Sequence, residues 1–363
     1  MLFVTRSINQ VLGGLEKQIV TIADGLSQRG HEVYVVSLDT GDVKPFFRSN
    51  LTQGITWIGL GIGNPEIKAN LGEKIRRQYE LYRLIRRVKP DVAVAFMIGA
   101  FLVSRLPTFF TRVPLILAER NSPDIYRLTS ARKKRFLYFI IMFFSKRITI
   151  QFEEYKNKYP RFLRKKFVAI PNSIELYPVR RDSIITSPRF VYAGRFSFQK
   201  RIDLLICSFK KYCELGGLGT LHLFGSGEQD HSLKELVKSL KAERIFFHPP
   251  TREITEVLKV CDINCLLSIW EGFPNFVAEG LAAGIPVIGL KECDGVSHLV
   301  ENGKTGWLST STDVEEIARI MRAIDDLSTD AMQSFQVQAK LSMSKFDSAT
   351  IFHKWDQLFF QLA

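Results

Sequence analysis

Short runs of apolar residues alternate with longer amphipathic stretches along the first half of the chain. Leu2–Thr5 is mostly apolar and predicts a buried strand. Residues 17–27 then place Ile19, Ile22 and Leu26 on one face of a helix. Further strands are predicted over residues 31–38, 91–97, 148–150 and a stretch that ends at residue 118. Strands and helices that alternate in this way are typical of an α/β fold.

The second half repeats the alternation, and the break between the halves predicts two domains. Its predicted strands cover residues 189–193, 221–224, 245–248 and 287–290. Residues 175–188 are poorly patterned and are interpreted as a linker. A chain of 363 residues suits two domains of ordinary size. We therefore expect one domain over residues 1–174 and a second over residues 175–346.

Residues 270–290 combine a glycine-bearing loop, a helix and a strand. Trp270–Pro274 is predicted to be a turn, and the residues over 275–283 are good helix formers. Backbone N–H groups at the start of such a helix attract anions. Glu271 lies in the loop and Glu279 about two turns into the helix, so two carboxylates bracket the site. The pattern favours a pocket for a phosphate-bearing, hydroxyl-rich ligand, but two solvated glutamates on an ordinary loop and helix would look the same.

This stretch resembles the retaining glycosyltransferases of family 4, which have two facing Rossmann-like domains (the GT-B fold). Their hallmark is E-G-F-P-N-x-x-x-E-A-x-A-x-G-x-P-V, and residues 271–287 are E-G-F-P-N-F-V-A-E-G-L-A-A-G-I-P-V. The resemblance implies a donor site in the cleft between the domains and a C-terminal helix, at about 347–363, that crosses back to the first domain. It also implies that Glu271 contacts the sugar and Glu279 the ribose of a nucleotide sugar. Further donor contacts are expected from Gly272, Phe273, Pro274 and Asn275.

Two other loops match the family. Gly194 and Arg195 follow a predicted strand, and Lys200 precedes the next helix, as in the family pattern G-R-x-x-x-x-K. An arginine fork and a mobile lysine suit a diphosphate, although they could also be two solvated cations. Gly13 and Gly14 match a glycine pair that lies beside the donor diphosphate in the family. That loop is neither a dinucleotide fingerprint nor a P-loop.

The strand that ends at residue 118 is followed by Glu119, Arg120 and Asn121. Open α/β sheets bind ligands at such strand ends. Many family members carry a histidine near this point, and the residues found here instead resemble a subgroup that acts on lipid-linked or surface glycans. We expect the three side chains to face the sugar or the acceptor. His298 stands where relatives commonly have a glutamate, and its role is left open.

The charge is unevenly distributed. The chain carries a net charge of +13, but residues 1–180 hold 30 Lys and Arg against 14 Asp and Glu, a net charge of +16. Such asymmetry indicates an anionic partner for the first half: a membrane, a nucleic acid or a diphosphate. The basic residues lie on amphipathic, Phe-rich stretches, which suits lipid better, so no nucleic acid partner is expected.

Two basic segments could lie on a membrane. Residues 67–89 predict an amphipathic helix, and basic residues flank the nine apolar residues Phe136–Phe144. Nine residues cannot span a bilayer. Each segment is either an ordinary helix, solvated or buried, or a docking site for anionic lipid. The residues predicted to face a membrane are Arg76, Arg77, Arg83, Lys133, Lys134 and Arg135.

The remaining expectations concern location, cofactors and mechanism. No secretory signal is visible at the N-terminus, so we expect a cytoplasmic protein held peripherally at the inner face of the cell membrane. The five cysteines match neither a disulfide framework nor a zinc pattern, and no metal or other cofactor is expected.

The predicted reaction moves a hexose or N-acetylhexosamine, with retained configuration, from a nucleotide diphosphate sugar, by default UDP-linked, to a lipid-linked or surface glycan. Its expected catalytic residues are Glu271, Arg195 and Lys200, which act without a metal. The alternatives are a nucleotide-sugar epimerase or a sugar phosphorylase on the same fold, or a basic nucleic-acid-binding protein.

Overall fold

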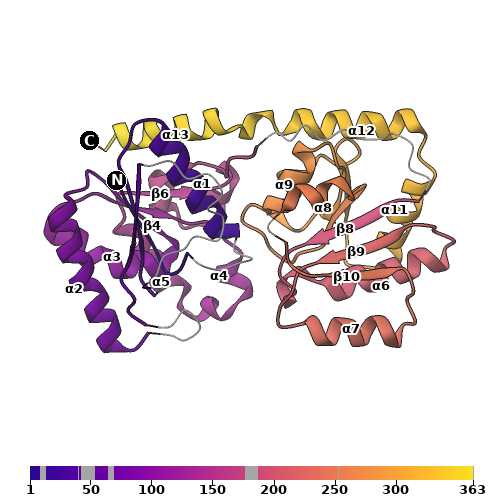
Figure 1. The fold of residues 1–363 in the computed structure, drawn as a ribbon, viewed down its shortest axis with the longest axis horizontal. Helices are drawn as coiled ribbons and strands as arrows, with labels where there is room; N and C mark the ends of the chain where they lie inside the picture. The colour runs from indigo at the N-terminus through magenta and orange to yellow at the C-terminus, as the bar shows by residue number, and fades with distance from the viewer. Residues whose placement is uncertain are drawn as a thin grey trace. The chain divides into compact units, whose positions relative to one another are not determined.

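The computed structural model describes residues 1–8, 14–39, 41, 54–63, 69–175, 187–251 and 253–362. The chain divides into two compact units. Unit 1 comprises Met1–Ser173 with Ser348–Ala363, and unit 2 comprises Ile174–Asp347. Each unit is built on its own parallel sheet with helices around it (Figure 1). The predicted α/β fold with two Rossmann-like domains is confirmed.

The sheet of unit 1 has the order β3-β2-β1-β4-β5-β6-β7, and its strand pairs are parallel. Its strands are β1 (Leu2–Thr5), β2 (Val33–Ser37), β3 (Ile55–Gly59), β4 (Ala93–Phe96), β5 (Leu115–Ala118), β6 (Arg147–Ile150) and β7 (Phe167–Ala169). The strands grow outward in one direction from β1 to β3 and in the other from β4 to β7. The reversal between β1 and β4 is the kind of point at which open α/β sheets bind ligands.

The helices of unit 1 are α1 (Gly14–Gln28), α2 (Leu71–Val88), α3 (Met97–Thr111), α4 (Ile125–Leu128), α5 (Arg135–Phe143) and α13 (Ser348–Phe360). Short 3₁₀ turns cover η1 (Ser130–Lys134), η2 (Glu153–Lys158) and η3 (Arg161–Lys166). Asn70 caps α2 with a reciprocal bond to Glu73, which satisfies two backbone N–H groups. The last helix belongs to this unit because α13 lies against α1 and buries Trp355 in the same apolar cluster as Phe3 and Ile19 (Figure 1).

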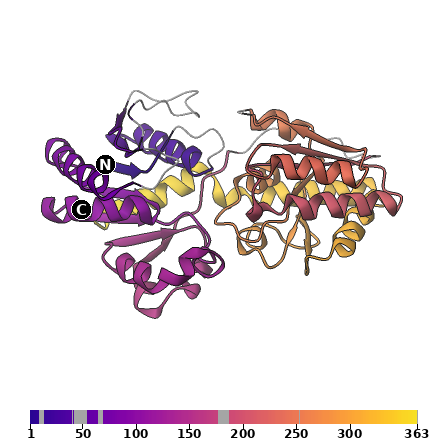
Figure 2. The same cartoon turned by 90° about the horizontal axis from the view of Figure 1, so that it is seen from below.

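The sheet of unit 2 has the order β10-β9-β8-β11-β12-β13, again with parallel pairs. Its strands are β8 (Arg189–Ala193), β9 (Thr220–Phe224), β10 (Ile245–His248), β11 (Ile263–Leu266), β12 (Val287–Leu290) and β13 (Gly306–Ser309). Its helices are α6 (Ile202–Glu214), α7 (Asp230–Ser239), α8 (Ile254–Lys259), α9 (Asn275–Ala282), α10 (Asp294–Ser297), α11 (Val314–Asp325) and α12 (Thr329–Ser342), with 3₁₀ turns η4 (Phe198–Lys200) and η5 (Ser344–Phe346). Helices α6 and α7 cover one face of this sheet, and α8 and α9 cover the other (Figures 1 and 2).

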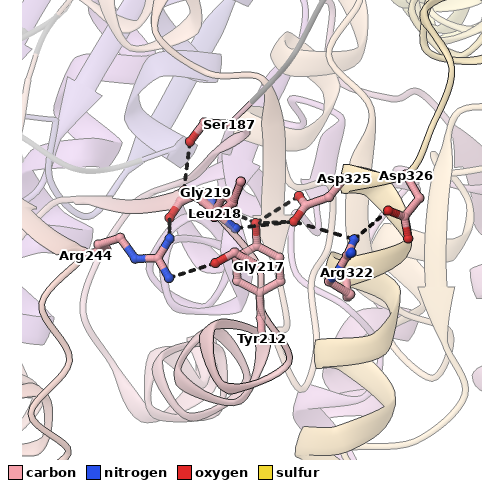
Figure 3. Close-up of polar contacts among 9 residues, drawn as sticks. All are labelled: Ser187, Tyr212, Gly217, Leu218, Gly219, Arg244, Arg322, Asp325 and Asp326. Atoms are coloured by element: carbon pink, nitrogen blue, oxygen red, sulfur yellow. Dashed lines mark hydrogen bonds and ion pairs between the residues drawn. The ribbon is translucent and has the colours of Figure 1, made fainter.

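A polar cluster centred on Tyr212 ties α6, α11 and the turn before β9 together (Figure 3). The Tyr212 hydroxyl contacts both carboxylate oxygens of Asp325 at 2.9 Å and accepts the Gly219 N–H at 2.7 Å. Arg244 donates to the carbonyl oxygens of Gly217 and Gly219, at 2.8 and 3.2 Å. Side chains thus satisfy the polar groups of a tight turn that the sheet and helices leave unpaired.

Within the described ranges, none of the helices combines the length and the apolar character needed to cross a bilayer.

Candidate active site

The loops that carry the predicted catalytic residues lie at one edge of the unit 2 sheet. Arg195 and Lys200 follow β8, and Glu271 follows β11. Strands β8 and β11 are neighbours and parallel, so their carboxyl ends meet at the same edge. The chain also reverses the direction of sheet growth between them, which makes this edge the expected ligand site of a doubly wound sheet.

Lys200 and Glu271 form an ion pair across the two loops. The Lys200 Nζ lies 2.5 Å from Glu271 Oε1, and the two side chains are 21% and 9% exposed. Two hydrogen bonds join the loops around the pair. The Gln199 side chain donates from Nε2 to the Trp270 carbonyl oxygen at 2.6 Å, and the Ile269 N–H donates to the Gln199 carbonyl oxygen at 2.9 Å. The loop contacts and the ion pair therefore hold the ammonium and the carboxylate in defined positions.

Helix α9 starts four positions after Glu271. Pro274 precedes the helix and provides no side-chain cap, so the helix N-terminus keeps its partial positive charge beside the loop. Asn264 Nδ2 donates to the Phe276 carbonyl oxygen at 2.8 Å and fastens the first turn of α9 to β11. Glu279 is buried in the second turn of α9, a helix that begins at the predicted residue 275. This geometry suits an anion held at the helix start.

Two further residues support the Glu271 loop and were not found from the sequence. A Cβ on Gly295 of α10 would lie 2.5 Å from the Glu271 carbonyl oxygen, so only glycine permits this approach. The Tyr192 hydroxyl donates to the Arg195 carbonyl oxygen at 2.8 Å. Burial, and then the nearby Glu271 carboxylate, raise the pKa of Tyr192 well above its ordinary value, so it remains a hydrogen-bond donor. Gly295 could not be found from the sequence because it contacts a residue 24 positions earlier. The contact of Tyr192 with Arg195 spans only three positions, but the family pattern begins at Gly194 and does not include Tyr192.

The other predicted donor contacts have different exposures. Arg195 is exposed, whereas Gly272, Phe273 and Pro274 are buried in the loop ahead of α9. Gly14 is the first residue of α1, after β1, and Gly13 lies outside the described residues. His298 follows α10 and donates its N–H to the Asp294 carbonyl oxygen at 2.9 Å. These roles stay predictions.

In unit 1, the polar residues after β5 are mostly turned inward. Glu119 is buried and accepts from the Tyr126 hydroxyl at 2.7 Å and from the Asn121 N–H at 3.2 Å. Burial raises the pKa of the Glu119 carboxyl. Arg120 donates to the Ile170 carbonyl oxygen at 2.7 Å, and its guanidinium lies 5.3 Å from the centre of the Trp355 ring. Burial lowers the pKa of Arg120 to about 10.

Glu119 and Arg120 therefore lie inside unit 1, and Asn121 is half-buried. Arg120 joins the end of β5 to α13 through its contact with the Trp355 ring. Their predicted contact with sugar or acceptor stays a prediction.

The predicted membrane-facing residues also differ in exposure. Arg76, Arg83, Lys133, Lys134 and Arg135 are exposed. Arg77 is not: its side chain pairs with the buried Asp39 carboxylate, with Arg77 Nη2 2.5 Å from Asp39 Oδ1. Arg77 Nε also donates to the Ile62 carbonyl oxygen at 2.7 Å. The prediction that Arg77 faces a membrane is therefore wrong, because the residue neutralises a buried carboxylate.

Helix α5 is exposed, which excludes its interpretation as a buried helix. Met142 is its buried residue, whereas Phe136 is 66% and Phe143 47% exposed. Neighbouring α3 exposes apolar side chains as well, and the Arg105 guanidinium of α3 lies 5.2 Å from the Phe109 ring centre and 5.6 Å from that of Phe144. The exposed apolar residues of this α3–α5 surface are Leu102, Leu106, Phe109, Phe110, Phe136, Leu137, Ile140, Phe143 and Phe144.

Two Rossmann-like units, each with a doubly wound parallel sheet, are the architecture of many nucleotide-binding proteins. Comparison with known proteins narrows this class. Residues 12–177 match the family model for Glycosyltransferase Family 4, and residues 180–340 match that for Glycosyl transferases group 1. Together the two matches cover most of the chain, which belongs to these GT-B glycosyltransferases.

Two relatives found by sequence comparison are also named as glycosyltransferases. An uncharacterised glycosyltransferase of Haemophilus influenzae is 25% identical over 315 residues, 85% of each chain. The putative colanic acid biosynthesis glycosyltransferase WcaL of Escherichia coli is 26% identical over 156 residues, 40% of this chain and 38% of WcaL. The crystal structure of Anabaena Alr3699/HepE in complex with UDP and glucose has a TM-score of 0.80 at 19% identity and covers 98% of both chains. This structural likeness shows the shared fold.

Proposed function

We propose that the chain is a retaining, metal-independent glycosyltransferase that moves a hexose or N-acetylhexosamine from a UDP-linked sugar to a lipid-linked or surface glycan. We further propose that it works at the cytoplasmic face of a membrane. The observation that carries the proposal is the fixed Lys200–Glu271 pair beside the start of α9. It brings a cation, a carboxylate and a helix N-terminus to one loop edge.

The chemistry follows from where charge develops. As the bond between sugar and diphosphate breaks, negative charge builds on the departing diphosphate. Lys200, Arg195 and the N-terminus of α9 supply positive charge at that place, and electrostatic stabilisation of this kind is often the largest contribution to catalysis. These groups can do the work of a metal ion. By resemblance to the family, Glu271 holds the sugar hydroxyls and Glu279 the ribose, and a donor phosphate oxygen takes the acceptor proton.

The choice of donor is supported by the Anabaena structure, which holds UDP and glucose. The choice of acceptor is supported by WcaL, whose name refers to colanic acid biosynthesis. Retention of configuration is supported by the E-x₇-E motif of residues 271–279.

Membrane association is supported by the α3–α5 surface. Exposed Phe and Leu side chains lie there beside Arg105, Lys133, Lys134 and Arg135. An apolar surface with basic residues at its margin fits the interface of an anionic bilayer, where each basic residue contributes about 1 kcal/mol. On α2, Leu71, Ile75 and Tyr79 form a second exposed stripe beside Arg76 and Arg83.

The test is a transfer assay with purified protein and a panel of nucleotide sugars, with and without vesicles that carry a polyprenyl-diphosphate-linked sugar, in the presence of a chelator. We expect nucleotide release with one donor that requires the vesicles, persists in chelator and gives a product of retained configuration. Conversion of the donor without acceptor would establish an epimerase instead. Loss of activity in chelator, restored by a divalent ion, would overturn the metal-independent mechanism.

A further inference from the structure

Unit 1 contains an open cavity of about 450 Å³ that no part of the proposed donor chemistry uses. A cavity of this size can hold a small ligand. It lies where α4, the start of α5 and the end of η2 come together. The residues that line it are Pro123, Asp124, Tyr126, Arg127, Arg135, Phe136, Phe139, Lys158, Tyr159 and Pro160.

The polar groups of the cavity favour an anion. Arg127, Arg135 and Lys158 supply three cations, and Asp124 is the one carboxylate among the lining residues. The Asp124 carboxylate is occupied by the Lys158 ammonium at 2.6 Å, and Arg127 Nη1 lies 3.9 Å from it. Arg135 has no carboxylate partner among the described residues. The cavity therefore keeps a positive charge that its own carboxylate does not neutralise, which suits a phosphate group.

The wall behind these charges is aromatic. The Tyr159 ring lies 5.7 Å from that of Phe139 and 6.3 Å from that of Tyr126, centre to centre. The Tyr159 hydroxyl is buried and has no hydrogen-bond partner in the part of the chain that the structure describes. The cavity thus has aromatic rings behind its charged residues.

The cavity opens beside the exposed apolar face of α5. Phe136 lines it and is also part of the α3–α5 surface, with Ile140 one helical turn further along α5 and Phe143 beyond that. A positively charged cavity that continues into an exposed apolar helix face matches a ligand with an anionic head and an apolar tail. Neither a free sugar phosphate nor a neutral lipid would use both parts.

We propose that this cavity binds the phosphate-bearing head of an amphiphilic lipid acceptor whose tail lies along α5 through Phe136 and Ile140. The inference rests on the proposed function, since it names the place where that function's acceptor is held. It also links the polar cluster after β5 to the acceptor, because Tyr126, a wall residue, donates to Glu119.

Binding is tested by calorimetry on the full chain with farnesyl diphosphate, a soluble lipid diphosphate, at concentrations below those at which this ligand aggregates. Arg127 and Arg135 are both exposed, so R127A/R135A should fold normally. The matched control is R161A/K165A, which removes the same charge from exposed residues of the neighbouring η3 turn that do not line the cavity. We expect binding to weaken by about tenfold or more in R127A/R135A, since two charge-assisted contacts are lost, and to change less than twofold in the control. Equal binding by both variants would overturn the proposal.

Two further ligands identify what the cavity recognises. Farnesol and inorganic diphosphate should each bind at least tenfold more weakly than farnesyl diphosphate. Dihexanoyl phosphatidylglycerol, a short-chain bilayer lipid, should not compete with it. If it competes equally well, the cavity is a site for bilayer phospholipid and the assignment to the acceptor is wrong.

The transfer assay separates this inference from the proposed function. Wild-type protein that transfers no sugar under any condition would refute the proposed function, whatever farnesyl diphosphate does. If the wild type transfers sugar, R127A/R135A should raise the KM for the lipid acceptor about tenfold and leave the KM for the donor unchanged. An unchanged acceptor KM would refute the cavity assignment alone.

Discussion

Replacing Lys200 with alanine separates a catalytic role from a structural one. The substitution removes the ammonium that lies 2.5 Å from Glu271 Oε1. If Lys200 stabilises the departing diphosphate, K200A should lower kcat/KM by about 10²–10³, as the loss of a well-placed electrostatic contact does in other enzymes. The fall should appear in kcat, because the charge on the diphosphate develops in the transition state.

The cost in stability should be much smaller. Breaking a fully buried ion pair costs about 3–5 kcal/mol, whereas an exposed pair contributes about 0–1 kcal/mol. With Lys200 21% exposed and Glu271 9% exposed, the pair lies between these cases and solvent screens it in part. We therefore expect K200A to lower the free energy of unfolding by about 1 kcal/mol, which is too little to account for a hundredfold loss of activity.

The assay measures nucleotide release under initial-rate conditions and unfolding by denaturant titration on the same preparations. The control is K211A, which removes a lysine in the last turn of α6 that is 34% exposed and lies 3.6 Å from Glu315. K211A should keep kcat/KM within about twofold. K200R should retain more activity than K200A, because it keeps the charge but not the shape of the ammonium.

One result would refute the reasoning. If K200A keeps kcat/KM within about threefold of wild type while losing about 1 kcal/mol of stability, Lys200 serves only as the structural partner of Glu271. The diphosphate charge would then have to be met by Arg195 and the α9 N-terminus.

Three other predictions concern the stability of unit 2. Y212F removes the hydroxyl that joins Asp325 and the Gly219 N–H (Figure 3), and it should lower the free energy of unfolding by about 2–3 kcal/mol in a denaturant titration. The control is Y138F, whose hydroxyl has no hydrogen bond among the described residues and whose loss should change stability by less than about 0.5 kcal/mol. Equal effects of the two substitutions would contradict this role of Tyr212. G225A places a Cβ 1.9 Å from the Gly194 carbonyl oxygen, so we expect it to lower the melting temperature by several degrees and to weaken donor binding. An unchanged melting temperature would contradict this expectation. Burial lowers the pKa of His222 below its ordinary 6.5, so the unfolded chain takes up the proton first; stability should fall as pH drops through 6.5 and level off below the folded pKa. H222Q should flatten this slope in melting curves between pH 7 and 5, and an unaltered slope would assign the effect elsewhere.

Sequence reasoning succeeded where the signal was local. The strands at 2–5, 31–38 and 287–290 are β1, β2 and β12, because short apolar runs bounded by polar or glycine residues leave few alternatives. The loop ahead of α9 was predictable for the same reason, since Gly272 and Pro274 mark a turn at the start of a helix. The family resemblance rests on this contiguous stretch.

Sequence reasoning failed where apolar residues occupy more than one face of a helix. Helix α3 (Met97–Thr111) was not predicted at all: it buries Phe101 and Val103, exposes Leu106 and Phe110, and contains Pro107, so no single apolar stripe marks it. The interpretation of α5 as possibly buried failed for a related reason, because an apolar run looks the same in a core and on a surface. Arg77 was misplaced because its partner Asp39 lies 38 positions earlier in the chain.

The same distinction explains why the two sides of the proposed reaction differ in how well they can be predicted. The candidate donor groups come from two loops after adjacent strands, so each loop carries its own motif. The cavity of unit 1 is assembled from α4, α5 and η2, and the Lys158–Asp124 pair within it joins residues 34 positions apart. Glu119 was predicted as a site residue only because it follows a strand, and that role stays a prediction. Arg127 and Lys158 look like ordinary solvated charges in the sequence. Residues scattered in this way form no contiguous motif, so a site built from them becomes visible only when the fold brings them together, whereas each donor loop can be recognised by itself.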